Sequence, residues 1–239
     1  MADFRQLTLD LPHQTSMSRD DYLKGAPNSR AFELIESWPD WPSRVVLLAG
    51  PVGSGKTHLA GLWAERVNAV SLPVEELVHH DPMDLVKCGA VLIEDADGTG
   101  RDDIALFHLL NAAREVNASV LITARSWTDG WGVQLADLLS RLRAATPVEL
   151  GEPDDELLKA VLLKLFADRQ LIVPMSVIDF VVVRMERSLG AAGQIVDELD
   201  RIALVETRSI TRPLAARIMS ALEEKQSSED HEMATLPFS

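Results

Sequence analysis

The stretch GPVGSGKT, residues 50–57, constrains the fold more than any other part of the chain. It matches the pattern G-x-x-x-x-G-K-[ST], follows the apolar run VVLLA directly and precedes a segment with helical spacing of apolar residues. Glycines let such a loop point its backbone N–H groups at phosphate oxygens, beside the positive end of the following helix. The motif predicts a nucleotide site, with Lys56 on the β and γ phosphates and the Thr57 hydroxyl on Mg²⁺. The candidate nucleotide-binding residues here are Gly50, Pro51, Val52, Gly53, Ser54, Gly55, Lys56, Thr57 and His58.

Short apolar runs alternate with helical segments on both sides of this loop. Strands are expected at 45–50, 69–74, 90–95, 119–125 and 148–153. Helices are expected at 29–38, 57–67, 104–117 and 134–146. Strands separated by helices favour a parallel sheet with helices on both faces. The predicted fold class is therefore α/β, a phosphate-loop parallel sheet followed by a small all-helical domain.

The pattern changes from Asp154 onward, because the remaining segments have helical periods and no strand runs. Apolar stripes are expected on helices at 157–166, 177–187, 195–203 and from Thr211 to Leu222. The predicted divisions are an N-terminal peptide and linker (1–19), a nucleotide-binding domain (20–152), a helical domain (153–224) and a frayed tail (225–239).

The composition of the chain argues against DNA-binding, secreted and membrane proteins. The formal net charge is −14, from 37 acidic and 23 basic side chains, whereas nucleic-acid binders usually present a basic face. Direct sequence-specific DNA binding is therefore not expected. The one cysteine, Cys88, forms no internal disulfide, and no run has the length of a membrane span or the pattern of a secretion signal. These features predict a cytoplasmic protein without a membrane partner.

An acidic pair, Glu94 and Asp95, ends the expected strand AVLIED. Such a pair beside a phosphate loop is expected to hold Mg²⁺ and to polarise the attacking water, with aspartate usually first. Here the longer glutamate comes first, and Asp97 is either a substitute ligand or a loop residue. Thr123 ends the strand SVLITA and would bring its hydroxyl beside the γ phosphate if the two strands are adjacent, although threonine also ends many ordinary strands.

The segment 134–146 places leucines on one helix face and Arg141 and Arg143 beside them. Such arginines commonly extend into solvent. In oligomeric phosphate-loop ATPases, however, an arginine on this helix can reach a neighbouring subunit's site and stabilise the transferred phosphoryl group. The histidines show no metal-ligand spacing.

The loop GPVGSGKTHLA, the strands LIED and SVLITAR, the helix LLSRL and the helical C-terminal region together resemble the AAA+ core of the replication initiator DnaA. A short DnaA-like chain with an N-terminal Gln-Leu-x-Leu-x-Leu segment resembles the Hda family of regulatory inactivators of DnaA. The resemblance implies that Gln6, Leu7, Leu9 and Leu11 dock on the β sliding clamp as an extended peptide. Taken alone, the same residues also fit an edge strand.

The resemblance assigns further roles by position. Tyr22 and Leu23 would line the adenine pocket, Thr123 would be the first sensor, and Arg141 would be an arginine finger acting in trans on ATP held by DnaA. The second-sensor arginine falls on Gly190, with Arg187 one turn earlier as a substitute. Glu94 and Gly190 together predict a switch loaded with ADP or ATP and Mg²⁺ that hydrolyses ATP weakly by itself.

Other functions share some of these features. A helicase loader or transposition-helper ATPase of the same clade would bind single-stranded DNA and hydrolyse its own ATP. A GTPase would need an Asn-Lys-x-Asp motif, and the chain contains no Asn-Lys pair. A small-molecule kinase would share the phosphate loop, and a clamp-binding adaptor without nucleotide would share only the N-terminal peptide. The sequence leaves open whether a homo-dimer or a larger oligomer forms.

Overall fold

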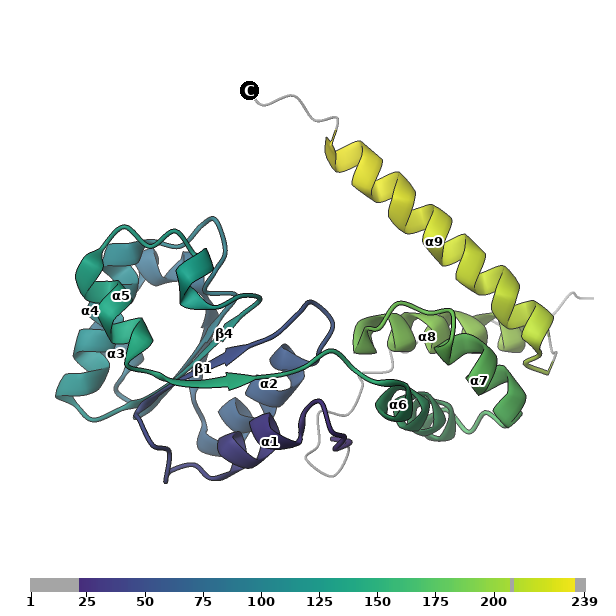
Figure 1. Cartoon of the computed structure of the whole chain (residues 1–239), viewed down its shortest axis with the longest axis horizontal. Helices are drawn as coiled ribbons and strands as arrows, with labels where there is room; N and C mark the ends of the chain where they lie inside the picture. Colours follow the sequence, from purple (N-terminus) through teal and green to yellow (C-terminus); the bar gives the residue numbers. More distant parts are fainter. Residues whose placement is uncertain (1–21, 207–208, 235–239) are drawn as a thin grey trace, which may run out of the picture.

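The computed structural model describes residues 22–206 and 209–234. The clamp-peptide residues Gln6, Leu7, Leu9 and Leu11 lie outside this part of the chain. Figure 1 shows a sheet covered by helices, followed by a separate group of helices. Within the described residues, no helix is both long and apolar enough to cross a membrane.

A five-stranded parallel sheet forms the first part, in the order β2-β3-β4-β1-β5. Its strands are β1 (Val45–Ala49), β2 (Val70–Pro73), β3 (Ala90–Glu94), β4 (Ser119–Ala124) and β5 (Thr146–Glu149). The three central strands are almost entirely buried, which explains their continuous apolar runs. The prediction of a parallel sheet is confirmed, and the order places β4 between β1 and β3.

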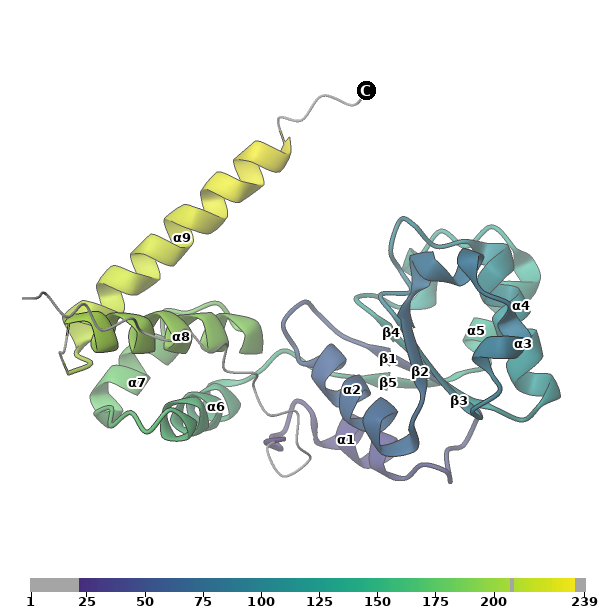
Figure 2. The ribbon, with the colours of Figure 1, turned by 180° about the vertical axis from the view of Figure 1, so that it is seen from behind.

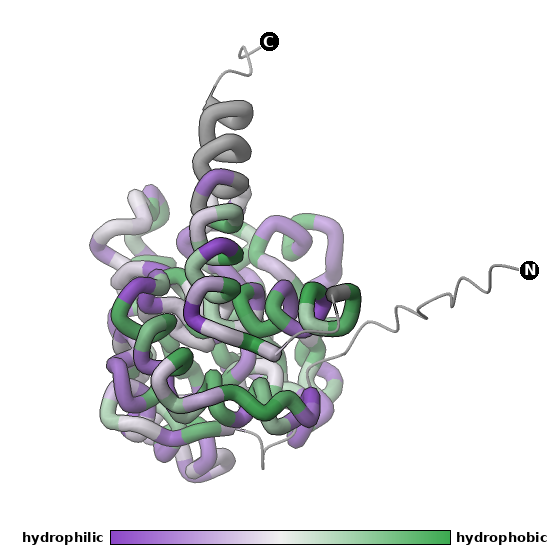
Figure 3. The backbone as a smooth tube through the Cα atoms, turned by 90° about the vertical axis from the view of Figure 1, so that its right-hand side faces the viewer, coloured by the Kyte–Doolittle hydropathy of each residue, from purple (hydrophilic) through white to green (hydrophobic). Residues whose placement is uncertain are grey.

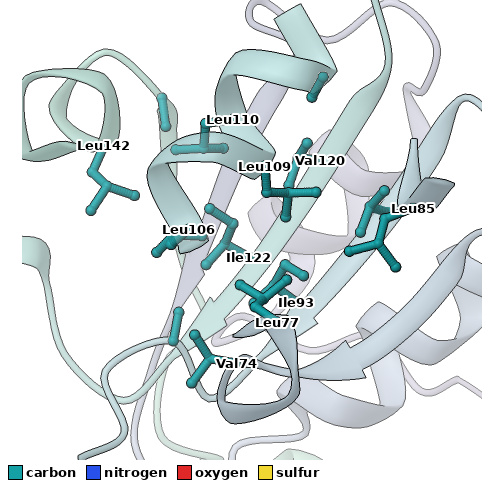
Figure 4. Packing of buried hydrophobic residues seen from close by; sticks show 14 of the residues in the cluster. Val74, Leu77, Leu85, Ile93, Leu106, Leu109, Leu110, Val120, Ile122 and Leu142 are labelled. Carbon is teal, nitrogen blue, oxygen red and sulfur yellow. The ribbon is translucent and has the colours of Figure 1, made fainter. Parts of the chain in front are cut away.

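Successive strand residues point to opposite faces, and each face packs on its own helices (Figure 2). Val46, Leu48 and Leu121 face α1 (Ser29–Glu36) and α2 (Lys56–Val67). The opposite face carries η2 (Val74–His79), α3 (Pro82–Leu85), α4 (Asp103–Glu115), η3 (Thr128–Gly130) and α5 (Ala136–Arg143). Figure 4 shows Leu106, Leu109 and Leu110 of α4 packed over Val120 and Ile122 of β4.

The second part consists of α6 (Asp155–Asp168), α7 (Met175–Val182), α8 (Leu189–Glu206) and α9 (Arg212–Ala234). Its own apolar core includes Leu158, Phe166 and Val196. Asp154 caps α6 by accepting a hydrogen bond from the Leu157 N–H at 2.8 Å. Helices α6 and α9 both pack against α8, and α7 packs against α6 and α9.

Several boundaries differ from the sequence-based expectation. Helix α7 ends at Val182, before Arg187, the last residue of its expected apolar stripe. Helix α8 begins at Leu189, next to Gly190, where the second-sensor position at the start of this helix was expected. Helix α9 continues to Ala234, into the segment expected to fray, and projects away from the other helices (Figures 1 and 3).

Candidate nucleotide site

The phosphate loop follows the carboxyl end of β1 and turns directly into α2. Gly53 and Gly55 have φ angles of 75° and 97°, in the left-handed region that favours glycine. The Lys56 Nζ donates hydrogen bonds of 2.8 Å to the carbonyl oxygens of Gly50 and Pro51. Lys56 is buried, and this burial lowers the pKa of its ammonium group, while the charge of Asp95 opposes that shift. The lysine is thus held inside the curl of the loop, where phosphate oxygens would replace the carbonyls as its partners.

Strand pairing brings the other candidate residues to this edge of the sheet. Thr123 on β4 pairs with Leu48 of β1, so the two strands are adjacent as the γ-phosphate assignment requires. The Asp95 N–H donates a 3.1 Å hydrogen bond to the buried Thr123 hydroxyl. Thr123 therefore lies between the phosphate loop and the acidic pair.

The two acids differ in their surroundings. Glu94 ends β3 and is half-buried, whereas Asp95 is exposed and has a φ of 51°. Asp97 accepts hydrogen bonds from the backbone N–H groups of Arg125 and Ser126 at 3.0 and 3.1 Å. Asp97 thus ties together the loops after β3 and β4, which favours its interpretation as a loop residue.

The donor set fits Mg²⁺ held jointly with a nucleotide. No group of three or more His, Cys, Asp or Glu side chains forms a metal site among the described residues. Mg²⁺ commonly uses one or two carboxylates together with phosphates and water. Thr57 and Asp95 are exposed and Glu94 is half-buried, so these are the oxygen-bearing side chains that would serve as protein ligands for such an ion.

A cavity of about 350 Å³ lies beside the loop, between the sheet domain and the helical domain. Tyr22 and Leu23 line it, together with His58 of α2. The Tyr22 ring stacks on Phe32 at 5.0 Å and meets the His58 ring edge-on at 5.5 Å. Burial raises the pKa of the Tyr22 hydroxyl. These aromatic walls suit a flat base next to the phosphate loop.

The helical domain closes the same cavity through α6 and α8. The Leu189 N–H donates a 2.8 Å hydrogen bond to the Gly53 carbonyl oxygen, so the start of α8 rests on the phosphate loop. Ser188 precedes α8, and its hydroxyl accepts a 3.2 Å hydrogen bond from the Ala191 N–H. Neither Ser188 nor Leu189 was predicted as a site residue, although a serine before a helical run is a recognisable cap.

Neither candidate for a second sensor brings a cation to the cavity. Gly190 lines the cavity without contributing a side chain. Arg187 pairs with Asp155 at 2.7 Å and donates to the Pro153 carbonyl oxygen at 3.3 Å, so it joins the segment before α8 to the start of α6. The Arg169–Asp197 ion pair also lines the cavity, and the sequence analysis did not identify it.

Arg141 lies far from this site. It is half-buried on α5, with its guanidinium 5.2 Å from the centre of the Phe107 ring. It lines a second cavity beside Val45, at the amino end of β1, whereas the phosphate loop follows the carboxyl end. A strand of this length spans roughly 16 Å, so Arg141 cannot reach phosphates bound in its own loop. Arg143 instead pairs with Asp129 at 2.7 Å on the surface.

Comparisons with known proteins agree with the observed fold and with the helical domain beside the nucleotide cavity. Residues 154–219 match the family model for the lid domain of Hda. Domain III of the replication initiation protein DnaA from Thermotoga maritima superposes with a TM-score of 0.74 at 19% identity, covering 88% of this chain and 98% of that one. Residues 154–219 thus form an Hda-type lid domain, and the chain as a whole has the fold of DnaA domain III.

Two further solved structures share this fold. AMPPCP-bound DnaA from Aquifex aeolicus has a TM-score of 0.63 at 17% identity, covering 90% of this chain and 70% of that one. The Thermotoga maritima RuvB Holliday junction branch migration motor has a TM-score of 0.64 at 17% identity, covering 86% and 72%. No curated protein matches the sequence. The Hda-type lid is the part that carries Ser188, Leu189 and Gly190 against the phosphate loop.

Proposed function

We propose that this chain binds ADP or ATP with Mg²⁺ and stimulates ATP hydrolysis on DnaA, through Arg141 acting in trans. The observation that carries the proposal is the position of Arg141, at the opposite end of β1 from its own phosphate loop. An arginine in that place acts only on a nucleotide held by another molecule. The Hda-type lid and the DnaA-like fold support DnaA as that molecule.

Different residues of the chain would have different roles in this function. Lys56 and the N–H groups of the loop bind phosphates, Thr57 with Glu94 and Asp95 would hold Mg²⁺, and Tyr22 and Leu23 would contact the base. Bound Mg²⁺ would offset the charge of the phosphates. Arg141 would stabilise the charge that develops on the phosphoryl group transferred in DnaA.

Weak hydrolysis by the chain itself is part of the proposal. Gly190 supplies no cation to the cavity, and Arg187 is held by Asp155 away from the loop. The bound nucleotide would therefore act as a structural element that holds the lid on the sheet domain. Docking of Gln6, Leu7, Leu9 and Leu11 on the β sliding clamp would bring the chain to DNA in the cytoplasm without direct sequence-specific DNA contact.

The test measures hydrolysis of ATP pre-bound to DnaA, with clamp-loaded DNA present or absent. We expect stimulation that needs the clamp and that falls about a thousandfold or more in Arg141→Ala, since a finger contributes roughly 10³–10⁵ to kcat. Arg143→Ala is the matched control, because Arg143 lies on the same helix and makes only an exposed ion pair with Asp129. Equal stimulation by the wild type and Arg141→Ala would refute the role of the finger.

The chief alternative is a helicase-loader or transposition-helper ATPase. Such a protein would bind labelled single-stranded DNA at physiological salt and hydrolyse ATP without DnaA. The net charge of −14 disfavours this behaviour. Filter binding with single-stranded DNA, run beside single-turnover hydrolysis by the isolated chain, separates the two functions.

A further inference from the structure

A second cavity, of about 290 Å³, opens at the amino end of β1, away from the nucleotide site. Arg44 reaches it from the residue before β1, Arg114 from the last turn of α4 and Arg141 from α5. Three separate parts of the sheet domain thus bring one arginine each to the same hollow. We call it the arginine cavity.

The charge of the arginine cavity is not neutralised within the described part of the chain. Its lining contains no acidic side chain. Arg44 donates a 3.0 Å hydrogen bond to the Asn117 side-chain oxygen, and Arg141 stacks over Phe107. Neither these two residues nor Arg114 forms an ion pair with a carboxylate of residues 22–206 or 209–234. In a chain with a net charge of −14, three converging arginines without acidic partners constitute a distinct positive site.

The floor of the arginine cavity is apolar. Leu110 and Ala113 of α4 form one side of it, and Ala144 and Ala145 after α5 form another. A free phosphate group would make no use of such a floor, because its contacts are hydrogen bonds and charges. An aliphatic side chain flanked by carboxylates would use both features, since it buries its apolar surface while the carboxylates meet the guanidinium groups.

We propose that the arginine cavity docks an acidic peptide segment of a protein partner, with one aliphatic side chain on the apolar floor. The cavity lies at the lower end of the volumes usual for ligand sites, roughly 300 Å³ and above, which suits one side chain rather than a folded element. A partner docked there would lie directly beside Arg141. Binding of the peptide does not depend on hydrolysis in trans, so this proposal stands apart from the proposed function.

The test measures binding of a fluorescein-labelled EDELDE peptide to the full chain by fluorescence anisotropy. The variant is the double charge reversal Arg44→Glu with Arg114→Glu. The matched control is Arg30→Glu with Arg184→Glu, which reverses two exposed arginines elsewhere and changes the net charge equally. An EDESDE peptide keeps the charges but removes the aliphatic side chain.

We expect the cavity variant to bind EDELDE at least about tenfold more weakly than the wild type, and the control variant to bind within about twofold of it. We also expect EDESDE to bind about threefold or more weakly than EDELDE. Equal loss in both variants would show a non-specific charge effect and overturn the proposal. Displacement of the peptide by tripolyphosphate, together with equal binding of EDESDE, would instead identify a phosphate site.

A second measurement covers the case in which the double variant does not fold. Amide chemical shifts of the wild type, followed by NMR during EDELDE titration, should change at Ala113, Ala118 and Ala144, which line the cavity. Changes confined to other surfaces would overturn the proposal.

Discussion

At the scale of single residues, Gly53 connects the two domains. Its carbonyl oxygen accepts the hydrogen bond from the Leu189 N–H, and its Cα faces Ser188. A Cβ at this position would lie 2.1 Å from the Ser188 Oγ, and the φ of 75° is unfavourable for any other residue. Gly53 is therefore required both by the shape of the phosphate loop and by the approach of the lid.

We predict that Gly53→Ala lowers nucleotide affinity about tenfold or more, because the lid must move away from the loop to admit the new methyl group. The control is Gly89→Ala, since Gly89 has a similar φ of 82° and nothing within 4 Å of an added Cβ. This control should lose roughly 1–2 kcal/mol of stability and keep its nucleotide affinity. Titration with a fluorescent ADP analogue measures both variants, and equal affinity losses would show that backbone strain alone is responsible.

At the scale of elements, a polar network fixes the segment before α5 to the loop after β3. The Arg101 side chain donates to the carbonyl oxygens of Ala96 and Trp131 at 3.1 and 3.0 Å, and its Nε donates to Asp103 at 2.8 Å. Asp103 also accepts a 2.8 Å hydrogen bond from the Gln134 N–H. The network thus positions the helix that carries Arg141.

We predict that Asp103→Asn destabilises the protein by about 2 kcal/mol at neutral pH, as expected for a lost charge-assisted hydrogen bond. Burial acts to raise the pKa of Asp103, but the hydrogen bonds from Arg101 and Gln134 outweigh it and leave the pKa below its ordinary value. The ionised carboxylate therefore contributes stability above its unfolded-state pKa, and this contribution is lost as the pH falls through the folded-state pKa.

Denaturant unfolding at several pH values measures this difference, which should shrink below about pH 4. Asp102→Asn is the control, because Asp102 caps α4 by accepting hydrogen bonds from the Ile104 and Ala105 N–H groups, and asparagine caps equally well. A difference between wild type and Asp103→Asn that stays constant with pH would contradict the assigned ionic role.

Buried strands with continuous apolar runs were predictable from the sequence, whereas contacts between distant segments were not. The buried runs of β1, β3 and β4 are mostly apolar, and the expected strands at 45–50, 90–95 and 119–125 differ by one residue from those observed. The short η2 and α3 carry too few turns to show a period. The pairing of Arg187 with Asp155 depends on how α8 meets α6, which no local pattern specifies.

At the scale of the whole molecule, the nucleotide cavity is lined by residues that pack against two separate apolar cores. Tyr22 packs against the apolar core under α1 and α2, whereas Leu165 and Leu189 pack against the core of the lid. All three residues line the same cavity. A ligand bound there contacts both domains, so the unfolding of either domain releases it.

We predict that ADP at one hundred times its Kd stabilises both domains by about 2.7 kcal/mol, because ligand binds only when the two cores are folded and in contact. Native-state hydrogen exchange measures this at the buried amides of Leu121 in β4 and Val196 in α8. Both amides should exchange about a hundredfold more slowly with ADP, and neither should change in Lys56→Ala, which lacks the phosphate-binding ammonium. Slowing at Leu121 alone would show that the nucleotide is bound by the sheet domain without the lid.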